Sequence, residues 1–163
     1  EGRRNYDVRE QNSVSGRPLA GTQLRIAERE GEFRIDATLD AAGRWKTSTR
    51  ATALRFRDNG VGYLNFHQRK ITHEIEWTTD AWFVALKGSA RRVEFALQTV
   101  GVGISPTPQI RDDISADLHI ERKLSARWTV YAEFMWERNR SNEVIASYYL
   151  NEGLLGIRWS WEK

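Results

Sequence analysis

Hydrophobic and polar residues alternate with a period of two along much of this chain. The pattern is clearest in residues 32–41, 114–121 and 127–136, and a less regular version covers 71–78, where His73 shares the apolar side. In 127–136 the residues on one side are Trp128, Val130, Ala132, Phe134 and Trp136. Successive side chains of a β-strand point to opposite faces, so this alternation predicts strands. No segment shows a helical repeat that competes with it.

Short turn signals separate these runs: Glu30-Gly31, Asp58-Asn59-Gly60, Thr78-Thr79-Asp80 and Leu124-Ser125-Ala126. Asn-Gly is the most specific, because both residues readily adopt the positive φ angles of a tight hairpin. We expect about ten strands (roughly 8–12) on these patterns. Their approximate ranges are 4–12, 20–29, 32–41, 45–57, 61–68, 70–78, 81–98, 111–121, 127–139 and 147–161. The prediction is one all-β domain over 1–163, antiparallel and up-and-down, with no separate linker.

Two architectures share this alternation: a soluble β-barrel or sandwich with its apolar side inward, and a transmembrane β-barrel with its apolar side toward lipid. Trp128 and Trp136 lie eight residues apart on one side. That spacing is about 26 Å of strand, or about 20 Å of height at a tilt near 40°, close to the roughly 25 Å apolar band of such barrels. The predicted membrane-interface residues are Trp77, Trp82, Trp128, Trp136, Trp159 and Trp161. Large aromatics also cap soluble cores, and His73 counts against a lipid-facing side.

Residues 124–161 carry a resemblance to a known group of proteins. They contain LSARWTVYAEFMWERNRSN followed by YYLNEGLLGIRWSW. This resembles the closing hairpin of porin-like outer-membrane β-barrel proteins of Gram-negative bacteria, in which an L-S-x-R-W turn precedes an aromatic strand, a polar N-x-S-N loop and a last strand with G-L-L-G-I-R-W. The resemblance implies an outer-membrane β-barrel, whole or part of a larger one. Members commonly end in an aromatic residue, whereas this chain ends Trp161-Glu162-Lys163.

The resemblance also implies a topology in which both termini face the periplasm. The turns near 30, 58–60, 78–80 and 122–126 are then expected on the periplasmic side. The segments expected outside lie near 13–19, 42–44, 68–70, 88–110 and 139–147. The longest of these, 88–110, contains two glycines and two prolines near its centre. We expect it to be a long surface loop or an extended hairpin.

The polar side of the predicted strands carries charges of both signs. If the apolar side contacts lipid, these residues face the barrel interior, either as a salt-bridged plug or as a narrow polar conduit. The predicted lumen-lining residues are Arg34, Asp36, Asp40, Arg55, Glu74, Glu76, Asp117, His119, Glu121, Glu133 and Arg158.

Composition narrows the function further. The 25 Lys+Arg and 22 Asp+Glu residues give a net charge of +3, and acids interrupt the basic runs, so nucleic-acid binding is not expected. The absence of cysteine excludes disulfides, thiolate metal sites and a cysteine nucleophile. The longest uncharged stretch, 95–110, contains two prolines and several polar residues, so it is not a transmembrane helix. Position 1 is Glu without a leader-like segment after it, which fits either a mature product or part of a longer chain.

Enzymatic chemistry has one candidate centre. Asp117, His119 and Glu121 share a side of one predicted strand, a spacing that suits a metal ion or an oriented general base. No serine is recognisably paired with His119, and Gly101-Val102-Gly103 lacks the Lys-Ser/Thr of a phosphate loop. We therefore expect no catalytic residues, no metal and no cofactor.

We favour a bacterial outer-membrane β-barrel protein that acts as a pore, an export conduit or a structural anchor for partner proteins. Its expected partners are the lipid bilayer of the outer membrane and other outer-membrane or periplasmic proteins. Two alternatives stay open: a soluble lipocalin-like β-barrel that binds a hydrophobic ligand, and a barrel-embedded hydrolase centred on His119.

Overall fold

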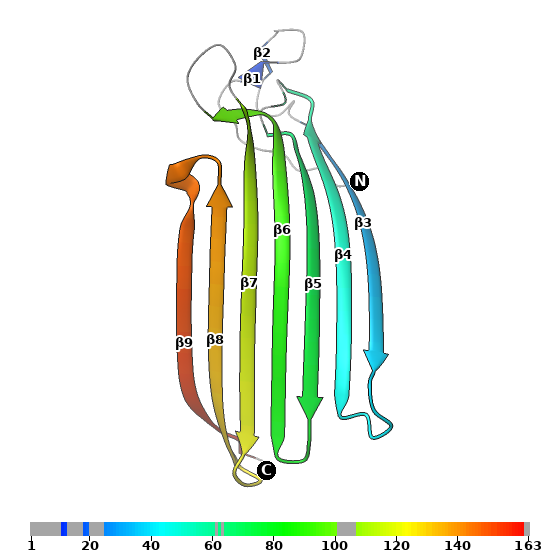
Figure 1. Cartoon of the computed structure of the whole chain (residues 1–163), viewed down its shortest axis with the longest axis vertical. Coiled ribbons are helices and arrows are strands. Elements are labelled where there is room, and N and C mark those ends of the chain that lie inside the picture. Colours follow the sequence, from blue (N-terminus) through cyan, green and yellow to red (C-terminus); the bar gives the residue numbers. More distant parts are fainter. Residues whose placement is uncertain are drawn as a thin grey trace.

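The chain forms one antiparallel sheet of seven long strands (Figure 1). The structure, a computed structural model, describes residues 11–12, 18–19, 25–60, 62, 64–100 and 107–161. The strands are β3 (Ile26–Thr38), β4 (Trp45–Asp58), β5 (Phe66–Thr78), β6 (Trp82–Val100), β7 (Thr107–Lys123), β8 (Trp128–Ser141) and β9 (Tyr148–Trp159). A small separate sheet pairs β1 (Gln11–Asn12) with β2 (Pro18–Leu19), and a 3-10 turn, η2 (Val144–Ala146), precedes β9. The predicted all-β, antiparallel, up-and-down architecture is confirmed.

Each long strand pairs with the strands before and after it in the chain, in the order β3-β4-β5-β6-β7-β8-β9. One register irregularity, between Glu94 and Thr99, interrupts the pairing of β6 with β7. The ladders satisfy the backbone N–H and C=O groups of the central strands on both sides. Among the described residues, β3 and β9 have a partner on one side only, so the sheet is open. The described residues include no helix with the length and hydropathy needed to cross a membrane.

Three short turns lie at one end of the sheet, the lower end in Figure 1, which we call the turn end. Between β3 and β4, the Asp40 carboxylate accepts a hydrogen bond from the Trp45 N–H at 2.8 Å, and Gly43 has a φ of 68°. Between β5 and β6, the Thr79 hydroxyl accepts from the Trp82 N–H at 3.0 Å. Between β7 and β8, the Ser125 hydroxyl accepts from the Trp128 N–H at 3.2 Å. The turns predicted at 78–80 and 122–126 are confirmed; we call the opposite end the loop end.

Two predicted breaks are wrong, because the chain runs straight through them. Glu30-Gly31 lies inside β3, where Gly31 pairs with Ala53, so the strands predicted at 20–29 and 32–41 are one strand. The expected break at 68–70 lies inside β5, where these residues pair with 52–54 of β4. The uninterrupted β4 offers a ladder partner at every position, and this outweighs the local turn signal. The sheet therefore has seven strands rather than about ten, and most of the strand predicted at 4–12 lies outside the described residues.

Because two predicted strand breaks do not exist, some connections lie at the opposite end of the sheet from the one predicted. Strand direction reverses at each turn, so a predicted turn that does not exist inverts the assignment of every earlier segment. The 42–44 segment consequently lies at the turn end and the 58–60 segment at the loop end, opposite to the prediction. In 88–110, residues 88–100 belong to β6 and 107–110 to β7, so the described part of this segment is an extended hairpin. Of the 13–19 segment, only 18–19 is described.

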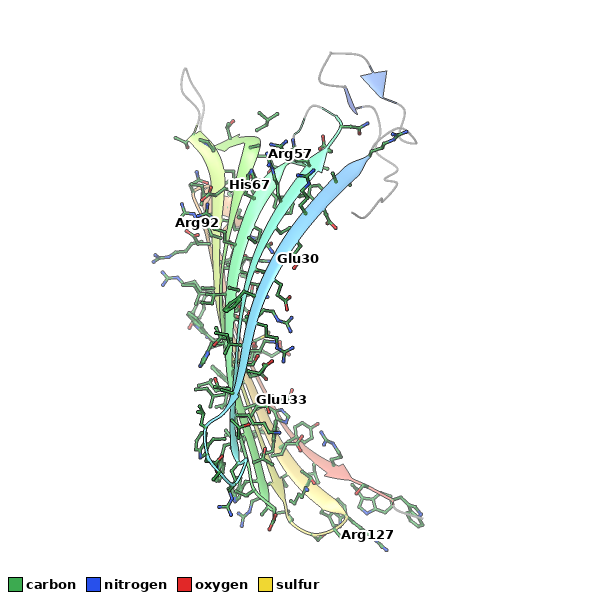
Figure 2. All side chains as sticks on the ribbon, turned by 90° about the vertical axis from the view of Figure 1, so that its right-hand side faces the viewer. Glu30, Arg57, His67, Arg92, Arg127 and Glu133 are labelled. Atoms are coloured by element: carbon green, nitrogen blue, oxygen red, sulfur yellow. The ribbon has the colours of Figure 1, made fainter. Side chains whose placement is uncertain are left out.

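The sheet is curved, with a convex and a concave face (Figure 2). Arg92 projects from the convex face, and Glu30 and Glu133 lie on the concave face. Among the described residues, a small apolar cluster is packed together on the concave face near the loop end. There Phe56 stacks on Phe66 with ring centroids 5.0 Å apart, and Phe66 lies 5.9 Å from Phe95. Apart from the β1–β2 pair, the described residues contain no second layer, so the backbone ladder carries much of the fold.

Gly156 of β9 provides a specific packing test. The ring of Tyr131 on β8 lies directly against Gly156, at the position that a Cβ would occupy. Gly156→Ala should therefore displace the ring and lower the free energy of unfolding by about 1–3 kcal/mol.

The matched control is Gly153→Ala on the same strand, where a Cβ would meet no atom within 4 Å. This change should raise the free energy of unfolding by about 0.5–1 kcal/mol, because alanine restricts the unfolded chain. Denaturant unfolding followed by tryptophan fluorescence measures both variants. Equal effects of the two substitutions would contradict the placement of Tyr131.

Candidate functional site

The register divides the sheet into rows whose members point to the same face. Three successive rows on the convex face contain no Asp, Glu, Lys or Arg. They are Trp45–Trp77–Val84–Ile120–Ala132–Leu155, Ala37–Thr47–Ile75–Leu86–Leu118–Phe134–Gly153, and Ile35–Thr49–His73–Gly88–Ala116–Trp136–Asn151. A fourth row toward the loop end is Phe33–Ala51–Ile71–Ala90–Ile114–Arg138–Tyr149. We call these four rows the apolar band.

The apolar band is exposed. Leu155, Phe33 and Ile35 have 83%, 63% and 53% of their surface accessible. Single exposed apolar residues are ordinary, but a continuous apolar surface across a whole sheet marks contact with lipid or with another protein. The band is therefore one half of the candidate functional site.

Tryptophans gather at the turn end of the band. Trp45 and Trp77 lie with ring centroids 6.0 Å apart, and Trp128 and Trp159 lie 6.3 Å apart. Trp161 packs edge-on against Trp159 at 5.2 Å, and the Arg122 guanidinium lies 5.0 Å from the Trp82 ring.

The sixth predicted interface residue, Trp136, lies nearer the loop end, where its ring meets Tyr149 at 6.1 Å. Sequence analysis did not include Trp45 in the interface set. Trp45 is recognisable as an interface residue only through its cross-strand partner, because it lies directly opposite Trp77 across β4 and β5. That register is not a local property of the sequence.

The concave face collects most of the predicted lumen-lining residues. Nine of them point to this face from five strands: Arg34, Asp36, Glu74, Glu76, Asp117, His119, Glu121, Glu133 and Arg158. Asp40 lies in the turn after β3 instead. Arg55 lies on the convex face, in the same row as Arg29 and His67. The prediction for Arg55 is wrong because the polarity of the two faces inverts near the loop end, where Phe56 and Phe66 take the concave side.

His119 lies at the centre of a charged network on the concave face. Its Nε2 lies 2.9 Å from Glu121, and its Nδ1 lies 3.1 Å from Glu133 on the neighbouring strand. The Arg158 guanidinium reaches the same Glu121 carboxylate at 3.2 Å and lies over the Tyr131 ring at 5.4 Å. The predicted trio of Asp117, His119 and Glu121 is thus only partly brought together. Within the described part of the chain, no group of three or more potential ligands is arranged to hold a metal ion.

A second network, nearer the loop end, is buried. Asp113 is 7% exposed and Asn139 is 2% exposed. The Asp113 carboxylate accepts hydrogen bonds from the Arg91 guanidinium and from the Asn139 amide, and Arg111 lies 3.2 Å from it. The three strands β6, β7 and β8 are linked through this one carboxylate. Sequence analysis did not single out Asp113, because its burial depends on cross-strand neighbours.

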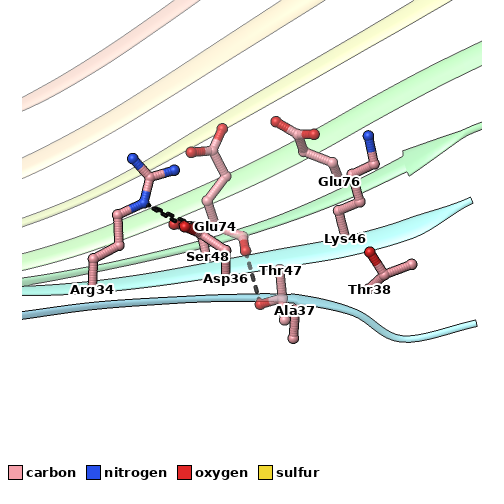
Figure 3. A pocket seen from close by; sticks show the side chains of 9 residues that line it. All are labelled: Arg34, Asp36, Ala37, Thr38, Lys46, Thr47, Ser48, Glu74 and Glu76. Atoms are coloured by element: carbon pink, nitrogen blue, oxygen red, sulfur yellow. Dashed lines mark hydrogen bonds and ion pairs between the residues drawn. The ribbon is translucent and has the colours of Figure 1, made fainter. Parts of the chain in front are cut away.

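A polar hollow of about 350 Å³ lies on the concave face over β3, β4 and β5 (Figure 3). Within the hollow, the Arg34 Nε–H donates a hydrogen bond to the Asp36 carboxylate at 2.9 Å. Lys46 lies directly opposite Glu76 in the register of β4 and β5. The Arg34 and Asp36 side chains are 49% and 57% exposed, so solvent reaches both. The concave face therefore carries charges of both signs on a solvent-accessible surface, which can hold water and small ions near it.

The Asp113 network allows a stability test. Asp113→Ala leaves the buried Asn139 amide and the Arg91 guanidinium without their shared acceptor, and should lower the free energy of unfolding by about 2–4 kcal/mol. Asp36→Ala is the control, because its ion pair with Arg34 is exposed and should contribute little to the free energy of unfolding. Urea titration measures both. A loss at Asp113 no larger than that at Asp36 would show that the network is not buried as described.

The comparisons with known proteins add no family to this geometry. No protein-family model matches the chain, and neither a curated protein nor a solved structure is significantly similar to it. The function therefore has to be argued from the two faces of the sheet.

Proposed function

We propose that the seven strands are part of the wall of a bacterial outer-membrane β-barrel, with the convex face toward lipid and the concave face lining a polar passage. The observation that carries this proposal is the polarity of a single curved sheet: an apolar band on the outside of the curve and charges on the inside. In a bilayer, a closed β-barrel can satisfy every backbone group, and its lipid-facing and lumen-facing residues alternate along each strand.

The dimensions of the band support the proposal. From Trp82 to Ala90 on β6, the convex side chains span eight residues, or about 20 Å of height at a 40° tilt. Transmembrane barrels have an apolar band about 25 Å tall with aromatic residues at both interfaces. Here tryptophans border the turn end, and Trp136 with Tyr149 lies toward the other border.

A soluble barrel with a hydrophobic ligand site requires the opposite polarity. Its interior is the concave side of the sheet and has to be apolar. On this sheet the concave side carries the His119 and Asp113 networks, and the apolar residues lie on the convex side. We therefore do not pursue the lipocalin-like alternative.

A hydrolase centred on His119 has no supporting geometry. In the part of the chain that the structure describes, the hydrogen bonds of the His119 ring go to Glu121 and Glu133, and no serine or threonine hydroxyl contacts it. A nucleophile would have to lie within hydrogen-bonding reach of the base.

Closure of the barrel requires further strands. Seven antiparallel strands leave β3 and β9 running in the same direction, so these two edges cannot pair antiparallel with each other. An odd number of additional strands, from elsewhere in the polypeptide or from partner chains, completes an antiparallel ring. The finished barrel thus has at least eight strands. Side chains fill the interior of an eight-stranded ring, whereas a larger ring leaves room for a passage.

Adjacent residues on β8 test the orientation of the faces. Phe134 lies on the convex face at mid-band, and Met135 lies on the concave face opposite Asp117. Phe134→Arg should destabilise the protein folded into phosphatidylcholine vesicles by about 2–4 kcal/mol, the cost of an arginine at the lipid-facing midplane.

Met135→Arg is the matched control and should have a small effect, because the new cation lies beside Asp117 on the polar side. Unfolding from vesicles by urea, followed by tryptophan fluorescence, compares the two. The orientation is wrong if Met135→Arg is the more damaging change, and the membrane assignment is wrong if the unmodified protein, together with the strands that complete its barrel, does not insert into vesicles at all.

Conductance tests the passage. The protein incorporated in a planar bilayer should give discrete ionic currents, and replacing Glu74 and Glu76 by Gln should lower its cation-to-anion permeability ratio, because lining carboxylates concentrate cations. Phe134→Leu on the convex face should leave that ratio unchanged. A flat baseline would remove the pore function and leave the structural-anchor alternative.

A further inference from the structure

Arginines follow the loop-end border of the apolar band on the convex face. Immediately beyond the row of Phe33, Ile71 and Ile114, the next row contains Arg69, Arg92 and Arg140, with Asp112 between the last two. The row after that contains Arg29 and Arg55, and Arg138 lies within the border row itself. We call these residues the arginine rim: Arg29, Arg55, Arg69, Arg92, Arg138 and Arg140.

Most of the arginine rim has no carboxylate partner among the described residues. Arg92 is the exception: it lies 2.9 Å from Glu94 and 3.9 Å from Asp112. Arg29 lies directly opposite Arg55 across β3 and β4, an arrangement of like charges that is unfavourable without a counter-ion.

Arg55 gives a second, independent indication of a missing partner. Arg29, Arg55 and Arg57 line a hollow of about 110 Å³ in which no described acid takes part. The Nε atom of Arg55 is buried and makes no hydrogen bond with the described residues. A buried guanidinium donor without an acceptor is costly, and an anionic oxygen supplied from outside the chain would satisfy it.

The arginine rim and the apolar band share one surface groove. A shallow groove of about 870 Å³ on the convex face is lined by apolar residues such as Phe33, Ile71 and Ile114 and also by Arg69, Arg92 and Arg140. On the convex face, its lining therefore changes along the strand direction from apolar residues to three arginines with one acid, Asp112, among them. An amphiphile with an acyl chain and an anionic headgroup matches this change.

The opposite border of the band is different. At the turn end, the convex rows of the described strands contain a single cation, Arg122, which is stacked on Trp82. On the convex rows, positive charge is thus concentrated at the loop-end border, which distinguishes one leaflet from the other.

Resting on the proposed function, we propose that the arginine rim binds the phosphate groups of lipid headgroups in the leaflet at the loop end. The Arg69 row lies about 5 Å above the last apolar row and the Arg29 row about 10 Å above it, at two residues per step and a 40° tilt. The headgroup region occupies roughly the first 5–8 Å beyond the hydrocarbon. The Arg69 row therefore lies within the headgroup region, and the Arg29 row lies just beyond it, from where long arginine side chains reach back. Guanidinium groups bind phosphate oxygens in a bidentate manner, so the chemistry also agrees.

The test compares two triple variants of the protein inserted into vesicles. Arg69→Gln, Arg92→Gln and Arg140→Gln together remove charge from the arginine rim. Arg34→Gln, Arg50→Gln and Lys70→Gln remove the same number of charges from the concave face. Binding is read as fluorescence transfer from the tryptophans to a labelled phosphatidic acid diluted in phosphatidylcholine, with labelled phosphatidylcholine as the reference lipid.

The unmodified protein should enrich phosphatidic acid around itself, and the rim variant should weaken this preference at least about tenfold. The concave-face variant should keep it, added salt should reduce it, and inorganic phosphate in solution should not compete at equal concentration. Insertion without preference for phosphatidic acid, or an equal loss in both variants, would overturn the lipid site while leaving the barrel wall intact. Failure of the completed barrel to insert even into pure phosphatidylcholine would instead overturn the proposed function.

Discussion

Cross-strand register is the constraint on which the rest of this structure depends. Each central strand is paired on both sides, and the side chains alternate between the apolar band, in which Arg138 is the one arginine, lysine or acid among the described rows, and a face rich in acids and bases. A slip of one residue would exchange the faces, placing Phe134 among the carboxylates of the concave side and Glu133 in the apolar band. Because no second layer of described residues buries either face, this pattern of alternation, rather than a packed core, defines the arrangement of the sheet.

The alternation inverts once, near the loop end. Below the inversion, Leu86 and Leu118 point to the convex side; above it, Val93 and Phe95 point to the concave side while Arg92 and Glu94 point outward. The pairing of β4 with β5 and of β5 with β6 continues in register through the inversion, while β6 becomes irregular against β7 between Glu94 and Thr99. On the proposed function, the inversion corresponds to a change of surroundings along the same strands. Below the inversion, the apolar convex face fits contact with lipid and the charged concave face fits contact with water. Above it, the charged convex face fits contact with water and the apolar concave face fits a packed interior. The arginine rim lies where these two regimes meet.

Much of the architecture was predictable from local pattern, whereas the site was predictable only in part. The runs at 114–121 and 127–136 specify strands and faces by themselves, and nine of eleven predicted lumen-lining residues share the concave face. Arg55 was assigned to the wrong face because the polar residues of β4 were expected to share one face along the whole strand. In the structure, the polar residues change face near the loop end. The breaks at Glu30-Gly31 and 68–70 were misread because pairing with β4 overrides local signals. Trp45 and Asp113 matter through partners on other strands, which no single segment of sequence reveals.

The Asp113 network lies where the inversion begins, and its position has a physical reason. The row that contains Arg91, Asp113 and Asn139 is followed toward the loop end by Val93 and the phenylalanine cluster. An apolar cluster alone tolerates small shifts, because contacts among similar side chains are interchangeable. A buried carboxylate with an amide and two guanidinium groups does not, since another register removes the acceptor that the Asn139 amide N–H and the two guanidinium groups share, at a cost of about 1–3 kcal/mol. Three strands are thereby held in register at the height where the convex face changes from apolar to cationic, so the arginine rim remains level with the border of the band.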